Sequence, residues 1–207
     1  YFRLMRNFRR YVPLFVYLFG SSPALSSSFL KGQPHNLQSL DKDTYYGEYA
    51  TSLRMGDLGY QSNAQNALFV CYNNLDNYVE SLRRGITEPH ADYEKIGLKD
   101  KNGNYQQLNT SLLQIENEFY SPIRPKRVTA SGEAPINALL RGGVEYIEVR
   151  CIDVNPFAPV GITAATMRFL DTFLLYCLLE ESPEFSSEAC NEASENLRRV
   201  VNEGRKP

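Results

Sequence analysis

Two residues of opposite charge, Glu148 and Arg150, lie two positions apart in a segment of alternating character. Residues 144–151 alternate between apolar and polar side chains, which is typical of a β-strand with one buried face. On such a strand both side chains leave the same face, with their bases ~6.5–7 Å apart. A carboxylate is a hard ligand for Mg²⁺, and a guanidinium offers a planar fork to phosphate oxygens. The pair indicates a site for a divalent cation and a phosphate; the alternative is an ion pair on a solvated face.

A second group of charges, Arg124, Lys126 and Arg127, lies on a segment stiffened by Pro122 and Pro125. Three cations within four residues suit a polyphosphate, although a basic loop that is only solvated has the same composition. The sequence contains neither GxGxxG nor GxxxxGK[ST], so a dinucleotide-binding fold, a kinase or a P-loop enzyme is disfavoured.

Arg54 and Tyr60 belong to a polar loop over residues 49–60, and both are suitable hydrogen-bond donors to a small carboxylate. His35 and His90 are isolated from any Cys or Ser partner, so neither is expected to be a catalytic base or a metal ligand. The GxSxG motif of a hydrolase nucleophile is absent.

The elements that must position these residues are a mixture of helices and strands. Helical periodicity predicts five helices, of which the one over residues 75–86 is closed by Gly85. Thr163 begins the helix over residues 163–180, and Ser186 or Ser187 can cap the helix over residues 187–202. The predicted helices cover residues 1–19, 75–86, 89–96, 163–180 and 187–202.

Strands are predicted over residues 66–71, 113–120 and 144–151, with Pro122 and Pro125 ending the second one in the basic loop. An Asn102-Gly103 pair predicts a hairpin turn. Residues 20–63 show no clear periodicity. Because strands and helices do not alternate as βαβ units, the expected fold class is α+β with an antiparallel sheet and packed helices.

The composition limits the function further. Of 207 residues, 43% are hydrophobic, and 22 Lys and Arg against 24 Asp and Glu give a net charge of −2. This composition excludes intrinsic disorder, and the absence of a net positive charge disfavours a dominant nucleic-acid role. The four cysteines form no CxxC pair, which favours buried thiols over a zinc site or a disulfide scaffold.

The first 26 residues resemble a secretory signal peptide, with arginines before an apolar run and small residues after it. Pro13 interrupts the run, which is too short to cross a bilayer. An amphipathic helix packed on a core is therefore expected, with a helix lying on a membrane surface as the alternative. The start at Tyr1 rather than Met indicates a piece of a longer protein.

Nine blocks of the sequence together resemble the proteobacterial glutamate–cysteine ligases, also called γ-glutamylcysteine synthetases. The resemblance runs from end to end of the chain and covers the middle-to-late part of the family's length. The short IEVR block at 147–150 also resembles glutamine synthetase, a member of the wider group of carboxylate–amine ligases. The nine blocks are Tyr1–Asn7, Tyr17–Ala24, Tyr49–Arg54, Asp57–Tyr60, Gln114–Tyr120, Pro122–Arg127, Leu139–Gly143, Glu145–Arg150 and Asp153–Phe157.

The resemblance implies an ATP- and Mg²⁺-dependent (or Mn²⁺-dependent) ligase of the cytoplasm, monomeric, that joins glutamate to cysteine through a γ-glutamyl phosphate. It implies that Glu148 is a metal ligand and that Arg150 meets the γ-phosphate. It assigns the cysteine carboxylate to Arg54, Tyr60 and Tyr120. Looser candidates for nucleotide phosphates are Arg124, Lys126 and Arg127.

Residues 1–207 are then part of a single catalytic domain with a glutamine synthetase-like core. The family's acidic metal-binding strand and its metal-binding histidine come from earlier sequence, so the chain alone is expected to be inactive. The alternative from a different class is a non-catalytic module that binds a nucleotide or an amino acid, or serves as a scaffold.

Overall fold

The computed structural model describes residues 1–30, 33–59, 68, 70 and 72–207, and the chain forms two compact units. The terminal unit holds both chain ends and comprises Tyr1–Ser62, Pro122–Arg124 and Glu148–Pro207. The inserted unit comprises Asn63–Ser121 and Pro125–Ile147.

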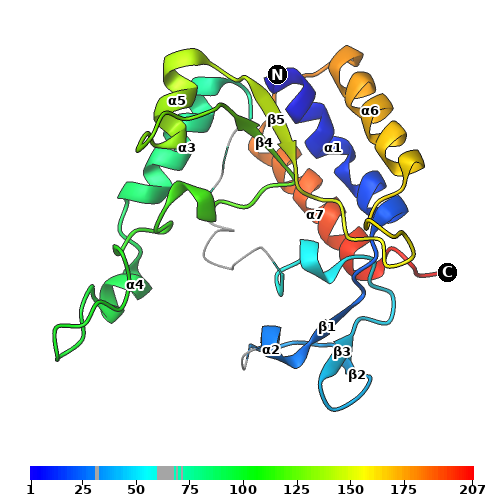
Figure 1. The fold of residues 1–207 in the computed structure, drawn as a ribbon, viewed down its shortest axis with the longest axis horizontal. Coiled ribbons are helices and arrows are strands. Elements are labelled where there is room, and N and C mark those ends of the chain that lie inside the picture. The colour runs from blue at the N-terminus through cyan, green and yellow to red at the C-terminus, as the bar shows by residue number, and fades with distance from the viewer. Residues whose placement is uncertain (31–32, 60–67, 69, 71) are drawn as a thin grey trace. The chain divides into compact units, whose positions relative to one another are not determined.

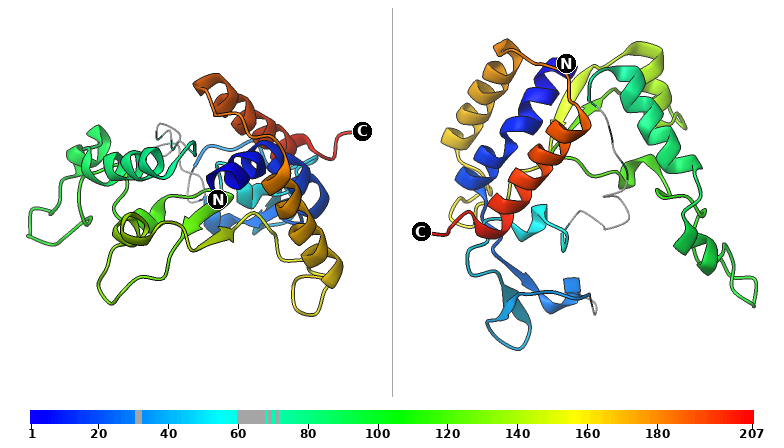
Figure 2. Two further views of the ribbon diagram at one scale, coloured as in Figure 1. Left: turned by 90° about the horizontal axis from the view of Figure 1, so that it is seen from above. Right: turned by 180° about the vertical axis from the view of Figure 1, so that it is seen from behind.

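Three helices form the core of the terminal unit. Helix α1 (Phe2–Phe19) packs against both α6 (Ala164–Leu179) and α7 (Ser187–Glu203), and lies between them in the ribbon views of Figures 1 and 2. Thr163 and Ser186 cap α6 and α7 by accepting hydrogen bonds from backbone amides of the first turn. The helices predicted over 1–19, 163–180 and 187–202 are thus confirmed.

Aromatic side chains fill the space between α1 and α6. Phe8 and Phe15 are fully buried, and their rings lie 5.5 and 5.9 Å from the ring of Phe173. The buried residues of α6 are Thr166, Phe173 and Cys177. Met167 and Leu178 of the same helix are exposed, although helical periodicity also predicts an apolar face that contains them.

The polar side of α1 also packs. Asn7 is buried and donates to the carbonyls of Cys177 and Glu180 at the end of α6, while Arg3 donates to the carbonyl of Glu180. These carbonyls have no partner within their own helix, so side-chain donors satisfy them. Among the described residues no helix is long and apolar enough to cross a membrane.

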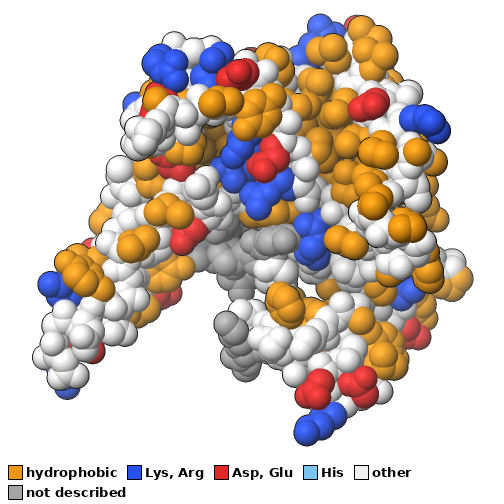
Figure 3. All heavy atoms as spheres, in the orientation of Figure 1, with side chains coloured by type: hydrophobic (Ala, Val, Ile, Leu, Met, Phe, Trp, Pro, Cys, Tyr) orange, Lys and Arg blue, Asp and Glu red, His pale blue; other side chains and the backbone are white. Residues whose placement is uncertain are grey.

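Hydrophobic side chains nevertheless remain on the surface of these helices. Figure 3 shows them gathered over α1 and α6, where Leu14, Leu18 and Leu175 are each about half exposed.

The segment expected to be irregular, residues 20–63, contains short regular elements. Strand β1 (Ala24–Ser26) pairs antiparallel with β3 (Thr44–Tyr46), which pairs antiparallel with β2 (Gln38–Ser39). The register places Leu25 opposite Tyr45. Strands of two or three residues are too short to produce a visible alternation, which explains why sequence periodicity missed them. Among its described residues this segment also contains the short helices α2 (Ser27–Leu30) and η1 (Leu53–Met55).

The inserted unit is built around α3 (Leu75–Thr87), which packs against α5 (Pro135–Gly142) and the 3-10 helix η3 (Glu116–Glu118). Helix α3 does not close at Gly85 as predicted. A Cβ at Gly85 would lie 3.0 Å from side-chain carbons of Leu68 and Leu113, so this glycine serves close packing inside the helix.

Two further predictions in this unit are confirmed. The short helix expected before Gly97 is α4 (Ala91–Ile96), and Gly97 follows it with a φ of 76°. An antiparallel bridge between Lys99 and Tyr105 flanks the turn at Asn102-Gly103.

The prediction of a strand over 113–120 was wrong. The carboxylate of Glu118 accepts the amide of Gln114 at 2.6 Å, and the amide of Glu118 donates to the carbonyl of Ile115. These local hydrogen bonds favour the η3 turn over a ladder. The predicted strand at 66–71 lies largely outside the described residues.

The basic loop is instead a strand. Strand β4 (Ile123–Lys126) pairs with β5 (Tyr146–Val149) in a two-stranded sheet, and β5 lies within the strand predicted over 144–151. Pro125 is tolerated because each strand of such a sheet has an open edge. The expected fold class, α+β with antiparallel strands and packed helices, is confirmed.

Candidate functional site

Glu148 lies in strand β5, and Arg150 follows directly after the end of that strand. Both residues are half-buried. The amide of Arg150 donates to the carbonyl of Pro122 at 2.8 Å, which fixes the end of the strand. The sequence pattern placed Glu148 in a strand correctly, whereas the strand ends one residue before Arg150.

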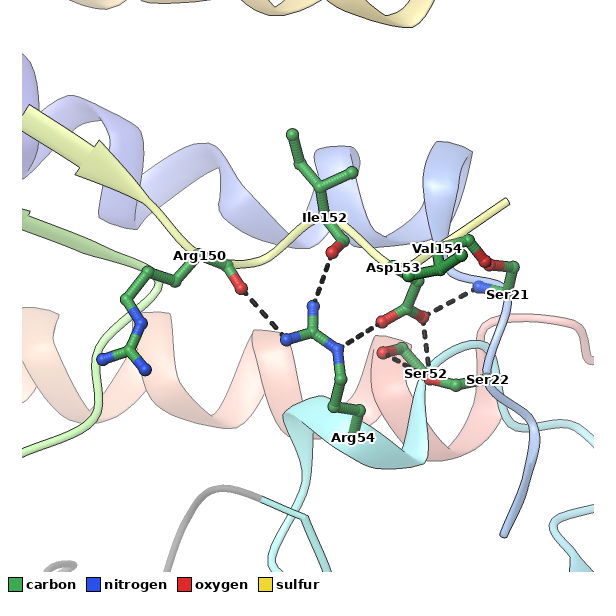
Figure 4. Close-up of polar contacts among 8 residues, drawn as sticks. All are labelled: Ser21, Ser22, Ser52, Arg54, Arg150, Ile152, Asp153 and Val154. Carbon is green, nitrogen blue, oxygen red and sulfur yellow. Dashed lines mark hydrogen bonds and ion pairs between the residues drawn. The ribbon is translucent and has the colours of Figure 1, made fainter. Parts of the chain in front are cut away.

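Arg54 lies against the segment that follows β5. Its Nε donates to Oδ1 of Asp153 at 2.6 Å, Nη2 to the carbonyl of Ile152 at 2.9 Å, and Nη1 to the carbonyl of Arg150 at 3.2 Å (Figure 4). Every nitrogen of the Arg54 guanidinium thus contacts the backbone or side chains of residues 150–153.

Asp153 is the anionic centre of this cluster, with a side chain only 2% exposed. Its Oδ2 accepts from the backbone amide of Ser21 at 2.9 Å and from the Ser22 hydroxyl at 2.7 Å. Burial raises the pKa of Asp153, but hydrogen bonds from Arg54, Ser21, Ser22 and Ser52 outweigh it, so the pKa is lowered overall. The carboxylate is therefore held in its charged form.

Arg124 on β4 is buried, at 5% exposure, and its Nε has no hydrogen-bond acceptor among the described residues. A buried donor of a cationic group that lacks an acceptor is costly, so this side chain is suited to an anion. The sequence singled out Arg124 only as one of three neighbouring cations.

The other two cations belong to the inserted unit. Lys126 is half-buried, and Arg127 donates to the carbonyls of Gly142 and Gly143 at the end of α5 while it pairs with Glu145 at 3.5 Å. Arg127 therefore caps the negative end of a helix in this structure.

Two tyrosines complete the residues expected from sequence. Tyr120 is buried, at 8% exposure. Tyr60 lies outside the described residues.

The described residues do not make a complete metal site. No three His, Cys, Asp or Glu side chains in this part of the chain lie together in a way that would hold an ion. Mg²⁺ requires about six oxygen ligands in octahedral geometry. Glu148 can supply one of them, and water or substrate phosphate oxygens commonly supply several of the others.

Sequence reasoning missed Asp153 and the serines that bind it. A lone aspartate after a strand and a Ser-Ser turn 131 positions away form no spacing pattern. The available signal was only that Asp153 and Ser22 both occur in blocks shared with the family.

Comparison with known proteins gives consistent results. The sequence model of the glutamate–cysteine ligase family matches residues 1–200. Over all of the chain, the sequence is 57% identical to a glutamate–cysteine ligase of Pseudomonas entomophila and 59% identical to one of Saccharophagus degradans. The chain spans 39% of the length of each of these relatives.

Solved structures agree. A glutamate–cysteine ligase of Francisella tularensis in complex with AMP superposes with a TM-score of 0.91 at 44% identity, covering all of this chain and 41% of that one. A bifunctional glutathione synthetase of Pasteurella multocida gives a TM-score of 0.68 at 26% identity, covering 98% of this chain and 21% of that one. The family match extends over nearly the whole chain and the fold agrees with it, so this chain belongs to the glutamate–cysteine ligase family.

Proposed function

We propose that the protein containing this chain joins the γ-carboxylate of glutamate to the amine of cysteine at the expense of ATP. The observation that supports this most is the match of the family over residues 1–200, with 57% identity to a relative over the whole chain. The product is γ-glutamylcysteine, the precursor from which glutathione is made.

The reaction has two steps. A γ-carboxylate oxygen of glutamate attacks the γ-phosphorus of ATP, and the bond to the β–γ bridging oxygen breaks, which gives γ-glutamyl phosphate and ADP. The cysteine amine then attacks the γ-carbonyl carbon, phosphate leaves with the C–O bonding pair, and the amine loses a proton. Charge on the phosphoryl oxygens must be stabilised in the first step, and water must be excluded throughout.

Arg150 is proposed to bind the transferring phosphoryl group, because its planar guanidinium donates two parallel hydrogen bonds. Arg124, Lys126 and Arg127 are proposed for the nucleotide phosphates. Arg124 is the best supported of the three, since it is buried and its Nε has no acceptor among the described residues. The Francisella relative was solved with AMP, a nucleotide.

Tyr60 and Tyr120 are proposed to bind the cysteine carboxylate through their hydroxyl donors. Arg54 is proposed to contribute to the same carboxylate site, although its guanidinium also holds residues 150–153. Glu148 is proposed as one ligand of Mg²⁺ or Mn²⁺, an ion that would neutralise phosphate charge when bound. The remaining ligands would be water, phosphate oxygens of the substrate and carboxylates outside the described residues. We further propose a monomeric enzyme of the cytoplasm in which residues 1–207 are part of a single catalytic domain.

The test uses the product of the complete reading frame that contains residues 1–207, called below the full-length protein. Product formation is followed by mass spectrometry with ATP, glutamate, cysteine and Mg²⁺, and each component is omitted in turn. We expect γ-glutamylcysteine, with an equal amount of ADP, only when all four are present. ADP release that does not require glutamate, or a complete mixture that yields no γ-glutamylcysteine, would reject the ligase function.

A further inference from the structure

The segment Arg150–Asp153 is attached to Arg54 at three points. Two are the backbone carbonyls of Arg150 and Ile152, at 3.2 and 2.9 Å, and the third is the carboxylate of Asp153, at 2.6 Å. Arg54 thus contacts the peptide backbone from which the Arg150 side chain extends. In Figure 4 the Arg150 carbonyl points toward Arg54, while its side chain extends away from the ion pair.

Asp153 anchors this arrangement from the opposite side. Its second oxygen binds the amide of Ser21 and the hydroxyl of Ser22, in the turn that follows α1. The Ser22 hydroxyl also lies 3.1 Å from that of Ser52, and the Ser21 hydroxyl donates to the carbonyl of Val154 at 2.9 Å. A carboxylate that accepts three hydrogen bonds has little freedom to rotate, so it fixes the guanidinium of Arg54 in turn.

We propose that Asp153 is a positioning residue for Arg150. Asp153 holds Arg54, and Arg54 holds the carbonyls on either side of Cys151, so the backbone at residue 150 has one orientation. This inference rests on the proposed function, because it assigns the positioned side chain to phosphoryl transfer. All of these residues belong to the terminal unit.

Only an arginine can make these contacts at residue 54. Three donor nitrogens in one plane reach three acceptors at once, whereas a lysine presents a single nitrogen. Removing the Asp153 charge would also leave the Arg54 cation, with a side chain 26% exposed, without its counter-ion. The segment 150–153 is then expected to open locally while the helices of the terminal unit stay packed.

Cys151 offers a reporter of this opening that does not depend on activity. Its thiol is 3% exposed, and burial raises its pKa to about 12, so the wild-type thiol is expected to react slowly with N-ethylmaleimide. Cys177 and Cys190 are buried in α6 and α7 and serve as internal controls. Peptide mapping by mass spectrometry after timed labelling gives a rate for each cysteine.

In the full-length protein we expect Asp153→Asn to speed labelling of Cys151 at least about tenfold, with Cys177 and Cys190 unchanged. Asp92→Asn is the matched control, since Asp92 forms an exposed ion pair with Lys95 on α4 and has no proposed role. If Asp153→Asn fails to fold, Arg54→Lys and Ser22→Ala take its place. Unchanged Cys151 labelling in the folded variants would overturn the proposal.

A kinetic cycle tests the link to Arg150. Asp153→Asn is expected to lower kcat at least about tenfold below its melting transition, with the KM for ATP nearly unchanged. In an Arg150→Lys background the same change should lower kcat by no more than about twofold, because the residue through which Asp153 acts is already altered. An equal loss of kcat in both backgrounds would contradict the inference.

The two proposals fail in different ways. A wild-type protein that makes no γ-glutamylcysteine would reject the ligase function, while Cys151 labelling would still decide whether Asp153 holds the segment. An active wild-type protein with unaltered kcat in Asp153→Asn would reject the positioning role alone.

Discussion

Glu148 lies in β5 and Arg150 directly after it, and the two residues are proposed to bind different groups. A carboxylate binds a hard cation, and a guanidinium binds phosphate oxygens. The hydrogen bond between Arg150 and Pro122 and the contacts of Arg54 fix the backbone directly after β5. At this scale the chemistry depends on charge type, so substitutions that preserve shape are the informative ones.

Glu148→Gln in the full-length protein is expected to raise the Mg²⁺ concentration needed for activity and to remove most of kcat. The change keeps the shape of the side chain but removes a charged ligand, at a cost of several kcal/mol in the transition state, roughly the scale of metal-held phosphoryl charge. Steady-state kinetics against Mg²⁺ concentration is the measurement. Glu195→Gln on α7, which removes an exposed ion pair with Arg198, is the control. Wild-type kcat and Mg²⁺ dependence in Glu148→Gln would place Glu148 outside the site.

Tyr120→Phe and Tyr60→Phe are expected to raise the KM for cysteine more than that for glutamate or ATP. Each change removes one hydroxyl donor and leaves the ring in place. A hydrogen bond to a charged group contributes roughly 1.5–3 kcal/mol, so an effect of about 10- to 100-fold is expected. Tyr105→Phe, at a tyrosine 72% exposed, controls for loss of a hydroxyl. A rise in the KM for glutamate instead would show that the wrong amino acid was assigned.

At the scale of elements, α1 is the central helix of the terminal unit. One side of it supplies Phe8 and Phe15 to the aromatic core, and the other supplies Asn7 and Arg3 to the end of α6. The turn after α1 then provides Ser21 and Ser22 to Asp153. The packing of α1 therefore determines where the Asp153 cluster is held.

Phe173→Ala is expected to destabilise the chain strongly, because its ring is 7% exposed and packs against two rings of α1. The expected loss in the free energy of unfolding is about 3–5 kcal/mol. Leu175→Ala on the same helix is the control, since Leu175 is 54% exposed and its replacement should cost less than about 1 kcal/mol. Denaturant unfolding of both variants is the measurement, and equal losses would contradict the described packing of α6.

Sequence reasoning predicted the long helices well, because 3.6-residue periodicity and the caps at Thr163 and Ser186 are local signals. Sequence reasoning failed over residues 113–120. There the Glu118 carboxylate accepts a hydrogen bond from a backbone amide, and this bond stabilises a turn although the sequence alternates. Sequence reasoning also missed β4 because Pro125 normally ends a strand.

The candidate site likewise contains residues that a local sequence pattern predicts and residues that no local pattern predicts. Glu148 and Arg150 were predicted because they lie two positions apart in one short alternating segment. Asp153 was missed because its ion pair with Arg54 joins residues 99 positions apart, and no local pattern encodes such a contact. Distant contacts are decided by packing of the whole unit.

At the scale of the whole molecule, the chain spans about two fifths of the length of the relatives it matches. Within the described residues the acidic side chains form no metal-binding group of three, and apolar side chains on α1 and α6 are exposed. Both observations agree with a chain that spans only part of the length of its relatives.

Residues 1–207 produced alone are therefore expected to show little or no ligase activity. A single carboxylate binds Mg²⁺ too weakly to organise phosphoryl transfer. The measurement is product formation by the purified chain beside the full-length protein, with circular dichroism to establish that the chain is folded. A turnover rate comparable with that of the full-length protein would contradict this expectation.

The central claim, that glutamate is activated as a γ-glutamyl phosphate, is tested most directly by following its oxygen atoms. The full-length protein is supplied with ATP, cysteine, Mg²⁺ and glutamate labelled with ¹⁸O in the γ-carboxylate, and the released phosphate is analysed by mass spectrometry. Attack of the carboxylate on ATP carries one labelled oxygen into the acyl phosphate, and attack by the cysteine amine then releases it. We predict one ¹⁸O atom in each phosphate released. Phosphate free of ¹⁸O would mean that water attacks ATP and would contradict the proposed reaction.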